Sequence, residues 1–161
     1  MFDTGARAHF VASRFAVPIM LPHRQGIIIT TGYPTKDAAE CTWLAAIPKV
    51  TANGLTQLMA HQLREHAIAA VTVAPTGWVW DWETLQVVND ALRTLGGVDA
   101  LYRDKPDLQN GESPEYTGRA VAMLAADPDV LAKSGRVLAI DDLAREYGFT
   151  DLDGRHPSLR Y

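Results

Sequence analysis

The stretch Ala69-Ala70-Val71-Thr72-Val73-Ala74 decides the fold of this chain. It is a run of small and β-branched residues without polar alternation, which is typical of a strand buried on both faces of a parallel sheet. Two further runs have the same character, Ile27-Ile28-Ile29-Thr30-Thr31 before it and Arg136-Val137-Leu138-Ala139-Ile140 after it. The sequence therefore predicts three short buried strands.

Segments with helical spacing separate these strands. Apolar periodicity and end signals predict helices at residues 6–20, from 48 to 66, at 82–95, at 114–126 and at 141–147. Ser113-Pro114-Glu115 is a strong helix start, with a cap, a first-turn proline and an acid near the positive end of the helix dipole. Residues 99–112 are polar and are predicted to form a loop. Strands that alternate with helices indicate an α/β fold with a parallel sheet.

The helix that ends near His66 sets the position of Lys49. Proline is tolerated in a first helical turn, so the regular helix is expected to begin at Pro48, which places Lys49 at its N-terminus. The buried side of this helix is expected to carry Leu55, Leu58, Met59 and Leu63.

Composition narrows the class of protein. The chain has 161 residues, of which 47% are hydrophobic, so a single domain over 1–161 with a real core is expected. The net charge of −4 and the lack of a basic stripe argue against nucleic-acid binding. No apolar run predicts a membrane span, no signal peptide is evident, and the histidines lack metal-site spacing. One cysteine, Cys41, leaves the cytoplasm as the expected location and excludes an internal disulfide.

Several motifs together resemble one known family. Gly26-Ile27-Ile28-Ile29, Ala60-His61-Gln62-Leu63-Arg64, Ala74-Pro75-Thr76-Gly77, Ser134-Gly135-Arg136-Val137-Leu138 and the tail Asp142 to Asp151 with Asp153-Gly154-Arg155 all carry the likeness. They resemble the C-terminal half of the short-chain dehydrogenase/reductase family. The resemblance implies a truncated Rossmann-like three-layer fold, in which a small parallel sheet of about three strands is flanked by helices. Such a narrow sheet has open edges, so a partner chain is expected.

Departures from the family pattern bear on its chemistry. Lys49 matches the catalytic lysine, but Ala45 stands four residues earlier, where the family has its tyrosine proton donor. By spacing, the catalytic serine falls at or near Gly32 and the asparagine near Phe2. The glycine-rich loop that cradles the dinucleotide phosphates does not occur in this sequence. The resemblance therefore implies no nicotinamide cofactor and no ketone reduction by this chain alone.

A ligand pocket is predicted at the strand ends. Trp78, Trp80 and Trp82 alternate, so in an extended segment they face one side, where they form either core packing or a pocket wall. Lys49 is either a surface charge or a cation in the cleft. Lys49, Tyr33 and Asp81 are the acid/base candidates, although capping explains Asp81 as well. The predicted ligand-binding residues are Thr31, Gly32, Thr76, Trp78, Trp80, Trp82 and Tyr102.

Two functions remain open from the sequence. The first is a cofactor-independent protein that binds or converts a small organic molecule by isomerisation, cyclisation or dehydration, as a homodimer or higher homo-oligomer. The second is a non-catalytic subunit that forms a heteromer with a full-length homologue through residues 6–20 and 41–66. A gene product without function is the third possibility.

Overall fold

The computed structural model describes residues 3–33, 43–75, 77–95, 98–104 and 106–157. The chain divides into two compact units. The first consists of Met1–Ala74 and Val121–Ala139, and the second consists of Pro75–Ala120 and Ile140–Tyr161. Each unit is described by itself below.

The first unit contains the predicted parallel sheet. Its strands are β1 (Gly26–Thr31), β2 (Ile68–Ala74) and β3 (Val137–Ala139), in the order β1-β2-β3. Both pairings are parallel, with Thr30 opposite Thr72 in one and Val73 opposite Leu138 in the other. Every residue of β2 is buried, as a central strand requires. The α/β fold predicted from the three apolar runs is confirmed.

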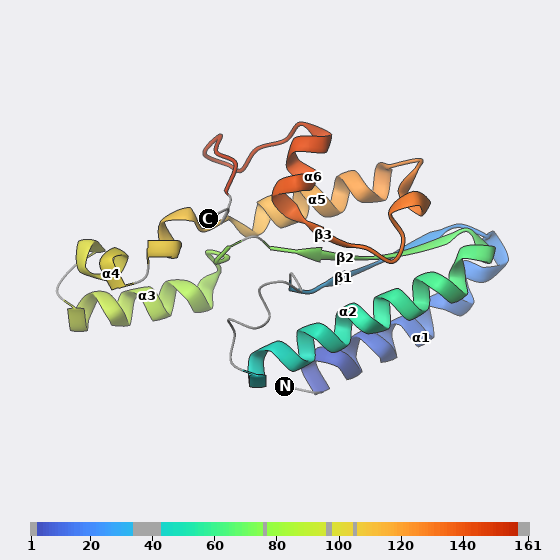
Figure 1. Ribbon diagram of the computed structural model, residues 1–161, viewed down its shortest axis with the longest axis horizontal. Helices are drawn as coiled ribbons and strands as arrows, with labels where there is room; N and C mark the ends of the chain where they lie inside the picture. The colour runs from blue at the N-terminus through green and yellow to red at the C-terminus, as the bar shows by residue number, and fades with distance from the viewer. Residues whose placement is uncertain (1–2, 34–42, 76, 96–97, 105, 158–161) are drawn as a thin grey trace. The chain divides into compact units, whose positions relative to one another are not determined.

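Helices pack against this sheet. A π-helical segment η1 (Asp3–Arg7) leads into α1 (Ala8–Met20), and α2 (Trp43–Leu63) precedes β2. Figure 1 shows α1 and α2 on the same side of the strands. The short 3-10 segments of this unit are η2 (Leu21–His23), η4 (Arg64–His66) and η6 (Val130–Lys133).

The long helix differs from its prediction in two ways. It begins at Trp43, so Pro48 lies inside it and Lys49 is not at its N-terminus. Leu58 is 66% exposed, whereas Leu63 is buried as predicted. The other residues that the helix buries after Pro48 are small or polar, namely Ala52, Asn53, Thr56 and Ala60. These small side chains let the helix axis lie close to β2. The larger residues Leu55 and Met59 are only half-buried.

The second unit is mostly helical. It contains α3 (Trp82–Leu95), α4 (Val98–Asp104), the 3-10 segment η5 (Pro106–Asn110), the start of α5 (Pro114–Ala126) and α6 (Ile140–Tyr147). The predicted bounds of α3 and α5 are confirmed. The loop predicted at residues 99–112 is wrong, because α4 and η5 occupy most of it. Among the described residues of these two short segments, only Leu108 is buried, so their sequence lacks the apolar periodicity that predicts a helix.

A backbone bridge positions the tryptophan segment of this unit. Val79 pairs with Glu112, with Trp80 N donating to Glu112 O at 2.8 Å and Glu112 N donating to Trp78 O at 2.8 Å. Helix α3 begins two residues after Trp80, so the extended conformation predicted for residues 78–82 does not reach Trp82. The bridge thereby ties the segment after β2 to the segment that starts α5.

Candidate functional site

The first group of polar residues lies where β1 ends, and we call Gly32, Asn53 and Thr72 the strand-end cluster. Gly32 follows β1, is buried, and donates its N–H to Val73 O at 2.9 Å. A Cβ added at Gly32 would overlap Asn53 Oδ1 and Thr72 Cγ2, both closer than van der Waals contact allows. Only glycine therefore fits here, at or near the position where the spacing predicts the family's serine.

Asn53 fills the space beside this glycine. It is 2% exposed, and its Nδ2 donates to the backbone oxygen of Tyr33 at 2.9 Å, which fixes the orientation of the carboxamide. Among the described residues, Asn53 Oδ1 and Thr72 Oγ1 are buried without a hydrogen-bond partner. Unpartnered buried polar atoms are rare in proteins because they destabilise the fold. The strand-end cluster therefore keeps these two polar atoms at a cost in stability.

The remaining predicted residues of the first unit lie around this cluster or away from it. Thr31 is exposed and Tyr33 is half-buried. Lys49 is exposed on α2, and burial together with the Lys49 charge lowers the pKa of His9 on α1, with burial the larger cause. Pro48 packs on η1, since a Cβ added at Gly5 would stand 2.8 Å from Pro48 Cβ. The ammonium group of Lys49 is thus close enough to α1 to influence His9.

The tryptophans of the second unit have different surroundings. Trp78 is 38% exposed, whereas Trp80 packs with Tyr102 and Leu92 on the buried pair Val88 and Leu108. Trp82 is the first residue of α3, and its side chain lies outside what the structure describes, as does the whole of Thr76.

Asp81 is exposed and donates its N–H to Val79 O at 2.9 Å. Of the predicted ligand-binding residues, the structure brings Trp80 and Tyr102 together in one hydrophobic cluster. Enclosure of one pocket by residues of both units stays a prediction.

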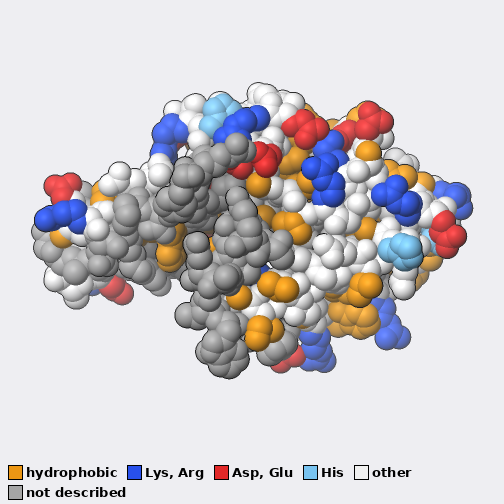
Figure 2. Space-filling model, viewed as in Figure 1, with side chains coloured by type: hydrophobic (Ala, Val, Ile, Leu, Met, Phe, Trp, Pro, Cys, Tyr) orange, Lys and Arg blue, Asp and Glu red, His pale blue; other side chains and the backbone are white. Residues whose placement is uncertain are grey.

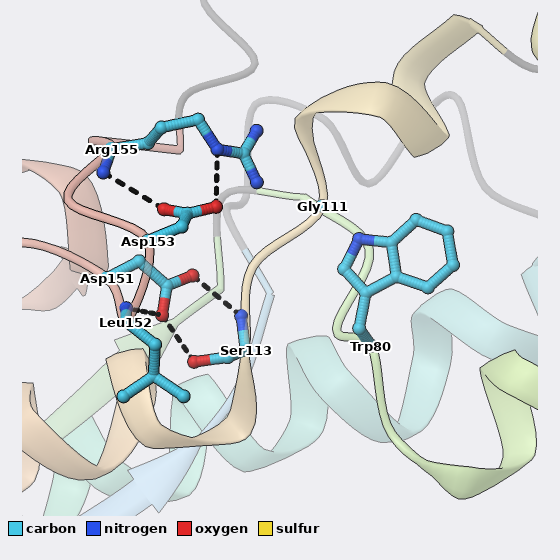
Figure 3. A pocket seen from close by; sticks show the side chains of 7 residues that line it. All are labelled: Trp80, Gly111, Ser113, Asp151, Leu152, Asp153 and Arg155. Carbon is cyan, nitrogen blue, oxygen red and sulfur yellow. Dashed lines mark hydrogen bonds and ion pairs between the residues drawn. The ribbon is translucent and has the colours of Figure 1, made fainter.

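A hollow of about 130 Å³ lies beside Trp80, and we call it the Trp80 hollow. Figure 3 shows the residues that line it, which are Trp80, Gly111, Ser113, Asp151, Leu152, Asp153 and Arg155. All of them belong to the second unit. A Cβ added at Gly111 would overlap Trp80 Nε1 and stand 2.6 Å from Cδ1, so glycine is needed for the indole to lie against the backbone here.

The C-terminal loop is fixed to the start of α5 on one side of this hollow. Asp151 Oδ2 accepts from Ser113 N at 2.9 Å, and Asp151 Oδ1 accepts from Ser113 Oγ and from Leu152 N, the latter at 2.7 Å. Ser113 Oγ in turn accepts from Tyr116 N at 3.2 Å and caps α5 as predicted. The carboxylate of Asp151 thus lies at the positive end of the α5 dipole.

Buried ionisable groups surround Tyr116 behind this loop. Tyr116 is fully buried, and its hydroxyl has no hydrogen-bond partner among the described residues. Burial, reinforced by the charges of Asp141, Glu112 and Asp151 and opposed by Arg145, raises the pKa of Tyr116 to about 12. This tyrosine is therefore a neutral phenol at every physiological pH.

Sequence reasoning missed two parts of these sites. Asn53 could have been found as the polar member of a row of small residues on one helix face. Arg155 and Asp151 were read only as part of the family's tail, although Asp-x-Asp-Gly-Arg is a turn-forming pattern with charges at both ends. In the described ranges, no helix is long and apolar enough to cross a membrane, and no group of three or more metal-binding side chains occurs.

Comparisons with known proteins place this geometry in context. No family model matches the chain. It is 34% identical over 154 residues to mouse dehydrogenase/reductase SDR family member 1, a match that covers 95% of this chain and 48% of the relative. The chain thus spans about half the length of the curated relatives it matches.

Solved structures share the fold. A Xanthomonas campestris protein described as a dehydrogenase aligns with a TM-score of 0.67 and 21% identity, covering 98% of this chain and 54% of that one. YwfH, an NADPH-dependent reductase involved in bacilysin biosynthesis, aligns with a TM-score of 0.67 and 17% identity, covering 83% of this chain and 52% of that one.

Proposed function

Because this chain belongs to the short-chain dehydrogenase/reductase family and corresponds to one half of its members, we propose that it is a cofactor-independent relative of the reductases. In this proposal it binds or converts a small organic molecule by isomerisation, cyclisation or dehydration. Such reactions need proton transfer and electrostatic stabilisation but no hydride donor. The proposal includes a cytoplasmic location, which cell fractionation would test.

One observation carries the proposal, the replacement of both hydroxyl groups that the family's chemistry uses. The proton donor's position holds Ala45, whose methyl group has no proton to transfer. By spacing, the serine's position falls at or near Gly32, and Asn53 and Thr72 occupy the space into which a side chain at Gly32 would extend. Both changes lie within the half of the family that this chain represents.

The residues proposed for the non-redox site are those at the strand ends and in the tryptophan segment. Lys49, Tyr33 and Asp81 are the acid/base candidates. The proposed ligand contacts are Thr31, Gly32, Thr76, Trp78, Trp80, Trp82 and Tyr102. The unpartnered oxygen of Asn53 supports a polar role at the end of β1, because a ligand or a water molecule would satisfy it.

Calorimetry tests whether the protein binds a nicotinamide cofactor, which redox chemistry of this family would need. Titration of the purified protein with NADH and with NADPH is expected to give no saturable heat. A dissociation constant in the micromolar range would overturn the proposal. In parallel, NMR of metabolite mixtures incubated with the protein and no nicotinamide is expected to show turnover of one component, and a Lys49→Ala variant should slow it.

A second function, that of a partner subunit, is favoured by the exposed surface of α1 and α2. Phe10, Phe15 and Ile19 on α1 are 52%, 71% and 70% exposed, and Leu58 on α2 is 66% exposed. Figure 2 shows hydrophobic side chains over these helices. Large exposed apolar residues grouped in this way mark protein interfaces. Within the described residues, β1 also pairs on one side only.

Light scattering distinguishes the possible assemblies. The proposal expects a homodimer or a larger homo-oligomer at micromolar concentration, and Phe15→Glu should shift it toward monomer because it places a charge in the interface. Co-purification with a co-expressed full-length homologue, combined with a monomeric state alone, would favour the heteromer. A monomer that binds neither itself nor the homologue would contradict both assemblies.

A further inference from the structure

The Trp80 hollow contains hydrogen-bond donors that nothing in the described chain uses. The indole N–H of Trp80 lies against Gly111 and has no hydrogen-bond partner among the residues that the structure describes. In Figure 3 the nitrogen edge of the indole is turned toward Gly111. A tryptophan N–H is a donor only, so a ligand that satisfies it must supply an acceptor atom.

Arg155 supplies further donors and is held in place. Its Nε donates to Asp153 Oδ2 at 2.6 Å, and its Nη1 donates to Gln109 O at 3.3 Å. Nη2 has no partner in the described part of the chain. Figure 3 shows the guanidinium turned to the Gly111 side of the loop. Two fixed contacts reduce the entropy that the side chain would lose on binding a ligand.

The acceptors of the hollow are already occupied. Asp151 is 4% exposed and accepts from three donors, Ser113 N, Ser113 Oγ and Leu152 N. Asp153 accepts from Arg155 N at 3.0 Å as well as from Nε, and these bonds lower its pKa. The unused hydrogen-bonding capacity of the lining is therefore mainly that of donors.

Net charge separates the possible ligands. Two carboxylates, Asp151 and Asp153, and one guanidinium, Arg155, give the lining a net charge of −1. The net negative charge would repel an anion. The dipole of α5 does not offset this repulsion, because it already interacts with Asp151. A cation would be repelled by Arg155, whose guanidinium already pairs with Asp153 at 2.6 Å, while Asp151 is only 4% exposed. An uncharged acceptor is the remaining class.

We propose that the Trp80 hollow binds a small uncharged molecule through a carbonyl or carboxamide oxygen, which accepts from Trp80 Nε1 and Arg155 Nη2 while Leu152 and the indole contact its apolar part. Leu152 is 63% exposed and gains from such a contact. The volume of about 130 Å³ limits the ligand to the size of a single substituted ring. This inference rests on the proposed function in one respect only: in both, the Trp80 segment contacts a ligand.

Three probes of matched shape test the proposal: benzamide, benzoate and benzylamine. The protein has four tryptophans, so its indole N–H groups give four resolved NMR signals at most. Titration with benzamide is expected to shift the Trp80 signal, identified by its absence in Trp80→Phe, with saturation in the millimolar range. Benzoate and benzylamine should bind more weakly.

Variants separate a binding role from a packing role. Trp80→Phe keeps an aromatic ring on Val88 and Leu108 but removes the N–H, and Arg155→Gln shortens the donor; each should weaken benzamide binding about two- to tenfold, as expected for one hydrogen bond. Trp43→Phe, the same substitution at a residue that does not line the hollow, is the matched control and should leave benzamide binding unchanged. Any one of three results would overturn the inference. These are no shift with benzamide, equal shifts with all three probes, and unchanged benzamide binding by both variants. Failure here would leave the calorimetric result with NADH and NADPH unaffected, so the two proposals fail separately.

Discussion

Gly32 and Gly111 each lie directly against a larger side chain, but their surroundings differ. At Gly32 the neighbours Asn53 and Thr72 are buried and leave no room for a side chain. At Gly111 the neighbour is the half-buried indole of Trp80, which borders a hollow. The proposed function expects the chemistry of the family to be lost near the first place. The second place borders open volume with unused donors, so the comparison contrasts a closely packed glycine with one beside a hollow.

Gly32→Ser is expected to have the largest effect. The new side chain would overlap two buried neighbours, which should destabilise the fold by about 1–3 kcal/mol, as overpacking of a core does. Urea denaturation measures the loss. Gly54→Ser on α2 is the matched control, because a Cβ there meets nothing within 4 Å.

The double variant Gly32→Ser with Asn53→Ala tests the cause. Removal of the Asn53 carboxamide should recover part of the lost stability, which a double-mutant cycle quantifies. If Gly32→Ser is as stable as the natural chain, the strand-end cluster is not closed and the contrast with Gly111 disappears.

Gly111→Ala should cost less than Gly32→Ser, about 1 kcal/mol, because Trp80 is half-buried and can turn away from the added methyl group. The same change should alter the Trp80 hollow, so benzamide should bind more weakly. Tryptophan fluorescence and denaturation, measured together, test both effects. An equal loss of stability at the two glycines would contradict the difference between their surroundings.

Much of this contrast lies beyond the reach of sequence. The strands were predictable, because apolar runs such as residues 69–74 have one simple structural solution. The start of α5 was predictable as well, since Ser113 and Pro114 act locally. The burial of Asn53 was not, because it depends on how closely α2 approaches β2, and the same holds for the exposure of Leu58. The hollow brings together Trp80 and Arg155, which are far apart in the chain, and no local pattern encodes that contact.

His9 on α1 gives the stability of the first unit a pH dependence. Burial and the Lys49 charge lower its pKa in the folded state, so the unfolded chain binds a proton more readily. Stability should therefore fall as the pH drops below the ordinary histidine pKa of about 6.5. Thermal melting at pH 7.5 and 5.5 is expected to show a larger difference for the natural chain than for His9→Gln. Lys49→Met should reduce the difference, and an identical profile for all three proteins would exclude the effect.

Tyr116→Phe is expected to have the smallest effect, with the opposite sign to the other substitutions. Most buried tyrosines lose stability when the hydroxyl is removed, because a hydrogen bond is lost. The Tyr116 hydroxyl has no partner among the described residues and lies near the charges of Asp141, Glu112 and Asp151. Its removal should leave stability unchanged or raise it by up to about 1 kcal/mol, while the edge contact with Phe149 at 5.4 Å is kept. Denaturation of the variant beside Phe149→Leu, which loses the ring contact instead, measures the two contributions separately. A loss of more than 1 kcal/mol in Tyr116→Phe would mean that the hydroxyl has a hydrogen-bond partner in solution. Among the described residues, the buried polar atoms without a partner would then be confined to the strand-end cluster.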